Sequence, residues 1–203
     1  MTGVSPDFLL VRKRAQPMSP SDRRAAILDA AIPLLKEHGR EVSTRQIADA
    51  AGVAEGTLFR AFGDKETLIS AAIEKFFDPA PFRDALRGID PDDGTEDKIH
   101  QVLEIMRRRF QGVVGFMAVL RQQGPPPSHR HQEDPEWLEI VRRMFRPDEL
   151  SVPVELLAHY LRVLAFSTAL PPLNESHRFT TDELVGLATR GVLPRDPSPR
   201  KKD

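Results

Sequence analysis

The stretch from residue 43 to 62 limits the fold of this chain more than any other. It reads STRQIADAAGVAEGTLFRAF, two short helical patterns on either side of Gly52. Glycine suits a tight turn at this point, because a positive φ angle costs it little. Ala48 and Ala51 are small enough to let two helices cross closely, and Leu58 gives the second helix a buried position. The pattern predicts a helix-turn-helix.

The rest of the chain shows helical spacing of apolar residues and no alternating strand pattern of useful length. Ser19-Pro20 favours a helix start, and Gly39 favours a helix end. Gly112 and Gly115 indicate a break in the longest helical pattern. We therefore predict an all-α fold of about nine helices: the two in residues 43–62, and others over 20–38, 64–77, 95 to the break, the break to 123, 135–146, 153–170 and 180–191.

Composition and charge exclude several classes of protein. The 203 residues include no cysteine, which excludes disulfides and thiolate chemistry and fits a reducing cytoplasm. The longest apolar run, Val113–Leu120, is far too short to span a bilayer, so we expect a soluble cytoplasmic protein without membrane contact. A net charge of −1 gives no sign of a nucleic-acid partner, although residues 1–24 carry five arginines and lysines against two aspartates.

Signatures of catalysis, cofactors and metals are missing from the sequence. We find no glycine-rich phosphate loop, nucleophile elbow or metalloprotease helix, and so expect neither an enzyme nor a cofactor. His129, His131 and Glu133 have metal-ligand spacing, but they lie in a proline-rich segment with no second cluster to complete a coordination shell. Arg107–Arg109 lies mainly opposite the apolar stripe of its helix, which predicts an exposed charged surface.

The start of the second helix of the pair suits contact with DNA. In a helix-turn-helix this helix normally lies in the major groove, with its N-terminal residues at the base edges. Gly56 allows the backbone to approach closely, and Thr57 can offer a hydroxyl to a base or a methyl group to thymine. Short helix pairs also serve as pure packing motifs, so this stretch alone leaves DNA binding and packing both open.

The flanking residues extend the pattern. The segments AAILDAAIPLLKEHG, STRQIADAAGVAEGTLFRAF and DKETL follow one another within residues 24–68. In this combination they resemble the N-terminal domain of the tetracycline-repressor (TetR) family of bacterial transcriptional regulators. Beyond residue 68 the resemblance is one of architecture, an all-α remainder that ends in two long apolar helices. The resemblance implies a homodimeric repressor that a small, mainly apolar ligand releases from a pseudo-palindromic operator in double-stranded DNA.

The resemblance also implies DNA contacts, residue by residue. They are Thr44 and Arg45 at the start of the first helix of the pair, Glu55, Gly56 and Thr57 at the base edges, and Phe59, Arg60 and Lys65 at phosphates.

Two of these residues, Phe59 and Glu55, and the nearby Ala61 affect the expected contact with DNA. Phe59 stands where a tyrosine is common in the family, and it lacks the hydroxyl that usually reaches a phosphate, a contact worth about 1 kcal/mol. Ala61 stands where the family usually has a histidine or another aromatic ring. Glu55 would face an anionic duplex, which is unfavourable unless its carboxylate accepts a hydrogen bond from a cytosine amino group.

For the second half of the chain, the resemblance implies a ligand pocket between the middle helices and a dimer interface on the last two. Methionine and aromatic linings tolerate varied apolar ligands. Residues 153–170 have two apolar faces, which indicates two packing partners, one of which can be a second subunit. The predicted ligand-binding residues are Met106, Phe110, Met117, Trp137, Met144 and Phe166, and the predicted dimer interface is Leu157, Leu161, Leu164, Leu184 and Leu187.

We thus expect four segments along the chain. They are a flexible basic arm over residues 1–18, a helix-turn-helix DNA-binding domain over 19–65, a ligand-binding and dimerisation domain over 66–193, and a disordered tail over 194–203. Two other classes of function stay open. One is a helical enzyme or carrier for an apolar molecule, and the other is a protein-interaction module that uses a helix-turn-helix without DNA.

Overall fold

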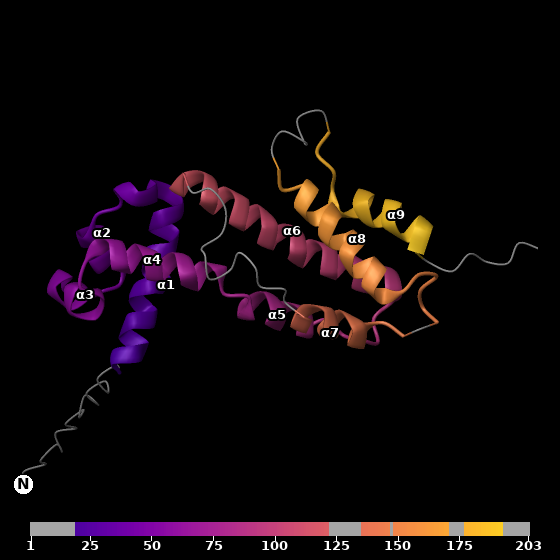
Figure 1. Ribbon diagram of the computed structural model, residues 1–203, viewed down its shortest axis with the longest axis horizontal. Coiled ribbons are helices and arrows are strands. Elements are labelled where there is room, and N and C mark those ends of the chain that lie inside the picture. The colour runs from indigo at the N-terminus through magenta and orange to yellow at the C-terminus, as the bar shows by residue number, and fades with distance from the viewer. Residues whose placement is uncertain (1–18, 122–134, 147, 171–176, 193–203) are drawn as a thin grey trace, which may run out of the picture.

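The computed structural model describes residues 19–121, 135–146, 148–170 and 177–192, and these contain helices and turns but no strand (Figure 1). The predicted all-α fold is therefore confirmed. The basic arm, the segment with His129 and His131, and the tail from residue 194 lie outside the described residues. The helices are α1 Pro20–His38, η1 Gly39–Glu41, α2 Thr44–Ala50, α3 Glu55–Phe62, α4 Lys65–Phe77, α5 Ala80–Arg87, α6 Thr95–Leu120, α7 Pro135–Met144, α8 Val154–Ser167 and α9 Thr181–Val192.

Side-chain caps start four of these helices where the sequence places capping residues. Ser19 Oγ accepts the Asp22 amide at 3.1 Å, and Asp64 accepts the Thr67 amide at 2.7 Å. Ser43 and Gln46 form a reciprocal capping box at α2, as Thr180 and Glu183 do at α9. Each cap satisfies backbone N–H groups that have no partner inside the helix, so these starts are set locally.

Two clusters of buried residues hold the chain together. The N-terminal cluster joins α1 to α4, and Phe116 and Leu120 from the end of α6 complete it. The C-terminal cluster joins α5 to α9 around the first half of α6. Figure 1 shows α6 running from one group of helices to the other. Gly39, with φ +59°, lets α6 come this close, because a Cβ there would lie 3.0 Å from the Val119 carbonyl oxygen.

Two helix predictions were wrong. One divided α6 into two helices and the other omitted α5, so the two errors cancel in the predicted number of helices. No break occurs at Gly112 or Gly115, since α6 is continuous from Thr95 to Leu120. Glycine weakens a helix by only about 1 kcal/mol, and the buried residues on both sides of this pair hold α6 in two clusters. Helix α5 was not predicted, although Phe82 and Leu86 have helical spacing and pack in the C-terminal cluster.

The prediction of an exposed charged surface at residues 107–109 holds only for Arg108. Arg109 donates to the Phe76 and Phe77 carbonyl oxygens at 2.8 Å each, and so binds the C-terminal end of α4. Arg107 donates to Thr181 Oγ1 at 2.6 Å and to the Phe179 carbonyl oxygen at 2.7 Å. These two arginines therefore tie α6 to α4 and to the start of α9.

Lys98 is a buried charge that was not predicted from the sequence. Its side chain has no exposed surface, and its ammonium donates to Glu149 at 2.7 Å and to the carbonyl oxygens of Pro91 and Met144 at 3.1 and 3.0 Å. All three ammonium protons thus have acceptors, which is what a buried charge requires. The described helices include none long and apolar enough to cross a membrane.

Candidate nucleic-acid interface

Helices α2 and α3 form the predicted helix-turn-helix. Ile47 from α2 and Leu58 from α3 are fully buried in the N-terminal cluster. Gly52 has φ +65°, the left-handed conformation that the turn requires, and the Val53 amide donates to the Ala48 carbonyl oxygen at 3.0 Å. The turn therefore brings the start of α3, the recognition helix, to the surface beside the start of α2.

The structure brings the predicted DNA-binding residues together on α2, on α3 and at the start of α4. The side chains of Arg45, Glu55, Phe59 and Arg60 are exposed, Gly56 is exposed as well, and Thr44, Thr57 and Lys65 are half-buried. No ion pair or hydrogen bond joins the Arg45 or Arg60 side chain to another described residue. This surface therefore carries two arginines without an ion-pair partner among the described residues, which suits an anionic partner.

Gly56 is not required by the packing of the chain itself. Its φ is not positive, and a Cβ at this position would meet no atom within 4 Å. Inside a helix glycine is less favourable than alanine by about 1 kcal/mol. The bare backbone at Gly56 leaves room for another molecule to approach α3.

Two of the predicted contact residues also bind within the chain. Thr44 Oγ1 donates to the Glu55 carboxylate at 2.5 Å, so the starts of α2 and α3 are joined by a charge-assisted hydrogen bond. Lys65 donates to the Arg40 carbonyl oxygen at 2.9 Å, which uses one of its three protons. Asp64, next to Lys65, caps α4, and the Thr67 amide lowers the pKa of its carboxyl below 3.8. The carboxylate at this helix start is thus charged at neutral pH.

Arg24 of α1 contacts the recognition helix, a role that was not predicted for it. Its Nη1 donates to the Ala61 carbonyl oxygen, and its guanidinium lies 4.0 Å from the centroid of the Phe62 ring. Phe59 is 42% exposed, so its ring is not used as a core residue. The sequence signal for Arg24 was only its place in a basic N-terminal stretch.

A pocket of about 600 Å³ lies between α6 and α8, and it contains two of the six predicted ligand-binding residues. Phe110 and Phe166 line it, with ring centroids 5.5 Å apart in an edge-to-face arrangement. Met106, Trp137 and Met144 are instead buried in the C-terminal cluster, and Met117 packs against the N-terminal cluster. The lining is Phe110, His159, Arg162, Val163, Phe166, Ser167 and Leu170.

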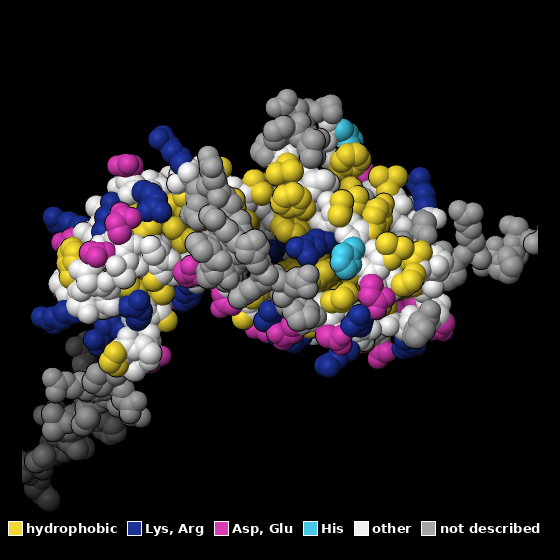
Figure 2. All heavy atoms as spheres, in the orientation of Figure 1, with side chains coloured by type: hydrophobic (Ala, Val, Ile, Leu, Met, Phe, Trp, Pro, Cys, Tyr) yellow, Lys and Arg dark blue, Asp and Glu magenta, His cyan; other side chains and the backbone are white. Residues whose placement is uncertain are grey.

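The predicted dimer interface needs a correction, because three of its five leucines have almost no exposed surface. Leu157, Leu161 and Leu184 pack inside the C-terminal cluster, where they cannot meet a second chain. Leu164 is half-buried and Leu187 is 51% exposed. The other apolar face of α8 is the open one, as Figure 2 shows by the hydrophobic side chains over α8 and α9. Its exposed residues are Leu156, Tyr160, Val163 and Phe166.

The helix-turn-helix falls inside a region that matches a known family. The family model for "Bacterial regulatory proteins, tetR family" matches residues 27–72. Over 59 residues the chain is 41% identical to the HTH-type transcriptional repressor KstR2 of Rhodococcus jostii (strain RHA1), a match that spans 29% of each chain. It is 24% identical over 163 residues to KstR2 of Mycobacterium tuberculosis (strain ATCC 25618 / H37Rv), which spans 70% of this chain and 77% of that one.

Solved structures share the fold over nearly their whole length. The TetR transcriptional regulator SCO0520 from Streptomyces coelicolor aligns with a TM-score of 0.54 at 20% identity, over 85% of this chain and 99% of the other. At this identity the likeness shows the fold alone. The helix-turn-helix region thus matches the tetR family of bacterial regulatory proteins, and the described chain shares its all-α fold with a solved TetR regulator.

Proposed function

We propose that this protein is a homodimeric transcriptional repressor that binds a pseudo-palindromic operator in the cytoplasm and leaves it when a small, mainly apolar ligand binds. The observation that carries the proposal is the surface of α2 and α3. There Arg45 and Arg60 have no partner among the described residues, and Gly56 leaves the start of α3 bare. A polyanion that enters close to α3 supplies what this surface lacks.

In the proposed complex α3 lies in the major groove. Glu55, Gly56 and Thr57 face base edges at its start, and Arg45, Arg60 and Lys65 face phosphates. Glu55 would oppose the duplex charge, but the hydrogen bond from Thr44 fixes its carboxylate in one place. A fixed acceptor at a base edge matches the amino group of cytosine.

The second copy would cover the open face of α8. Leu156, Tyr160 and Val163 are spaced i, i+4 and i+7, which places them along one side of the helix. Leu187 extends the apolar surface onto α9. Two such helix pairs would form a four-helix bundle, and its geometry would set the distance between the two recognition helices.

The ligand would occupy the pocket between α6 and α8. Its lining is mainly apolar, and Phe110 on α6 shares a helix with Phe116, which is buried in the N-terminal cluster. A small shift of α6 on ligand binding would therefore change how the helix-turn-helix is held. A coupling of about 1–3 kcal/mol is enough for such a response.

The DNA-binding proposal is tested with a duplex that the wild-type protein selects from a random-sequence library. Thr57→Ala should change the base preference, whereas Arg60→Ala should weaken all sequences and reduce the salt slope of binding by about one. Arg143→Ala on α7 removes the same charge from a remote exposed site and should leave both unchanged. If the wild-type protein selects no duplex, the repressor proposal is wrong, and an enzyme, carrier or interaction module becomes the better hypothesis.

A further inference from the structure

A cleft of about 440 Å³ lies between the first turns of α1 and the recognition helix, beside the helix-turn-helix itself. Two arginines of α1 and one of α3 contribute to it, together with the hydroxyl groups of a serine and a threonine. None of its lining residues carries a carboxylate, so its electrostatic field favours an anion. The lining is Pro20, Ser21, Arg23, Arg24, Thr57, Arg60 and Ala61.

Arg24 is held in this cleft by contacts with α3. Ala61 belongs to the last turn of α3, where carbonyl groups have no partner within the helix, and Arg24 donates to that carbonyl oxygen. The Phe62 ring below the guanidinium restrains it further. This is the only hydrogen bond of the Arg24 side chain with the described residues, so four of its five N–H donors remain for another acceptor.

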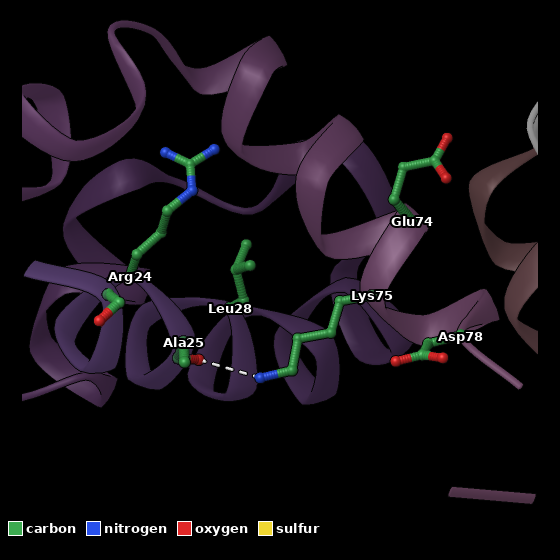
Figure 3. Close-up of a pocket in the computed structure, with 7 residues that line it drawn as sticks. Arg24, Ala25, Leu28, Glu74, Lys75 and Asp78 are labelled. Carbon is green, nitrogen blue, oxygen red and sulfur yellow. Dashed lines mark hydrogen bonds between the residues drawn. The ribbon is translucent and has the colours of Figure 1, made fainter. Parts of the chain in front are cut away.

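A neighbouring cleft is less suited to an anion, because carboxylates line it. It has a volume of about 550 Å³, lies between α1 and α4, and is also lined by Arg24 (Figure 3). There Lys75 pairs with Asp29 at 2.7 Å and extends to the Ala25 carbonyl oxygen, and the carboxylates of Glu74 and Asp78 are part of the lining. In Figure 3 the Arg24 guanidinium lies apart from the Lys75 ammonium. An anion is thus favoured on the α3 side of Arg24.

We propose that the cleft between α1 and α3 is a phosphate site that holds a backbone phosphate of the bound DNA, with Arg24 as its anchored donor. The proposal rests on the DNA-binding function, because Thr57 and Arg60 line both this cleft and the part of α3 that faces DNA. The positive N-terminal end of α1 adds to the attraction. Asp22, in the first turn of α1, accepts from Ser19 Oγ at 2.7 Å and does not line the cleft.

The test measures binding of the selected duplex by fluorescence anisotropy at several salt concentrations between about 50 and 200 mM. Arg24→Gln should reduce the salt slope by about 0.9 and the affinity on the order of tenfold, with the same base preference as the wild type. Arg24→Lys keeps the positive charge and should therefore keep the wild-type salt slope of DNA binding. Arg143→Gln, the matched loss of an exposed arginine on α7, should change neither quantity.

A second variant tests the cleft without removing the contact between Arg24 and α3. Ser21→Asp places a carboxylate in the lining near the start of α1, where an acidic residue favours the helix, so the fold is retained. Its DNA affinity should fall on the order of tenfold.

The outcomes separate this proposal from the DNA-binding function itself. A wild-type protein that binds no duplex overturns both proposals. A wild-type protein that binds, with Ser21→Asp equally tight or with Arg24→Gln unchanged in salt slope, overturns the phosphate site alone. A changed base preference with an unchanged slope would make Arg24 only a positioning residue for α3, and this also overturns the phosphate site.

Discussion

The surface of α2 and α3 and the outer face of α8 and α9 expose opposite kinds of side chain. The first carries Arg45 and Arg60, to which the described part of the chain offers no ion pair. The second leaves Leu156 57% and Val163 64% exposed, in a chain that buries most of its large apolar residues. Each surface lacks a different partner, a polyanion in one case and an apolar surface in the other. The two proposed interactions therefore use separate parts of the molecule.

The two interiors differ as well. The buried members of the N-terminal cluster are all hydrophobic, whereas the C-terminal region also buries Lys98, paired with Glu149. Apolar packing tolerates small rearrangements, but a buried ion pair has one geometry in which all its hydrogen bonds are made. The C-terminal region is therefore the one whose interior includes a buried ion pair, and the first prediction acts on this difference.

The largest effect is expected from breaking the buried ion pair. Glu149→Ala leaves the Lys98 charge buried without its carboxylate, which should lower the free energy of unfolding by about 3–5 kcal/mol in urea titrations. Lys98→Met removes the charge together with its need for a partner and should lose clearly less. Hydrogen exchange should show the loss of protection in α6 to α8 before α1 to α4. A Glu149→Ala variant as stable as the wild type would remove the difference between the interiors.

The second-largest effect is expected from a charge placed on the open apolar face of α8. Val163→Glu places a charge where the second copy is proposed to pack, and it should weaken dimerisation on the order of 100-fold, or about 3 kcal/mol. Sedimentation velocity over a range of protein concentrations measures this change. Arg143→Glu on α7 is the control with a charge change on another exposed surface. If Val163→Glu remains a dimer at the concentrations where the wild type does, the interface lies elsewhere.

The smallest effect is a dependence of stability on pH through two carboxylates, the helix cap Asp64 and Glu104 between α6 and α9. The Thr67 amide lowers the pKa of Asp64 from 3.8, and a hydrogen bond from Thr181 lowers the pKa of Glu104 from 4.5. A lowered pKa means that the carboxylate stabilises the folded state above its ordinary pKa and that this stability is lost as the pH falls through the lowered value. Urea midpoints measured from neutral pH to about pH 3 should fall for the wild type.

Asp64→Asn is the matched variant for this measurement, since asparagine can still cap α4 without a titrating group. The difference in midpoint between wild type and variant should shrink as the pH drops below about 4. A difference that stays constant over this range would show that Asp64 contributes no charge-dependent stability. The same measurement on Glu104→Gln, which removes a titrating group between α6 and α9, would then show which region loses stability in acid.

Local features account for the predictions that succeeded. The helix-turn-helix follows from Gly52 and the small residues around it, and the starts of α2, α4 and α9 follow from capping residues within three positions of the helix. These contacts lie within one short stretch of chain, so the sequence contains both partners in a fixed order. For this reason the all-α fold and the place of the recognition helix were predicted correctly.

The predictions that failed concern features set by contacts between distant segments rather than by local ones. The unbroken α6, the anchoring of Arg107 and Arg109, and the buried face of α8 each depend on segments more than 30 residues away or on packing between helices. Periodicity showed that α8 has two apolar faces, but the two faces are alike in composition. Only the position of α6 and α9 decides that Leu157 is buried and Leu156 is not.

The sequence by itself determined the helical class of this protein and the stretch that forms the helix-turn-helix, because short-range spacing and capping specify these features. The tertiary structure alone decided which cations stay without counter-charges, which apolar face stays open, and that Arg24 joins α1 to the recognition helix. The physical reason is that exposure and pairing are properties of groups brought together across the chain. A residue's own sequence neighbours do not fix what packs against it.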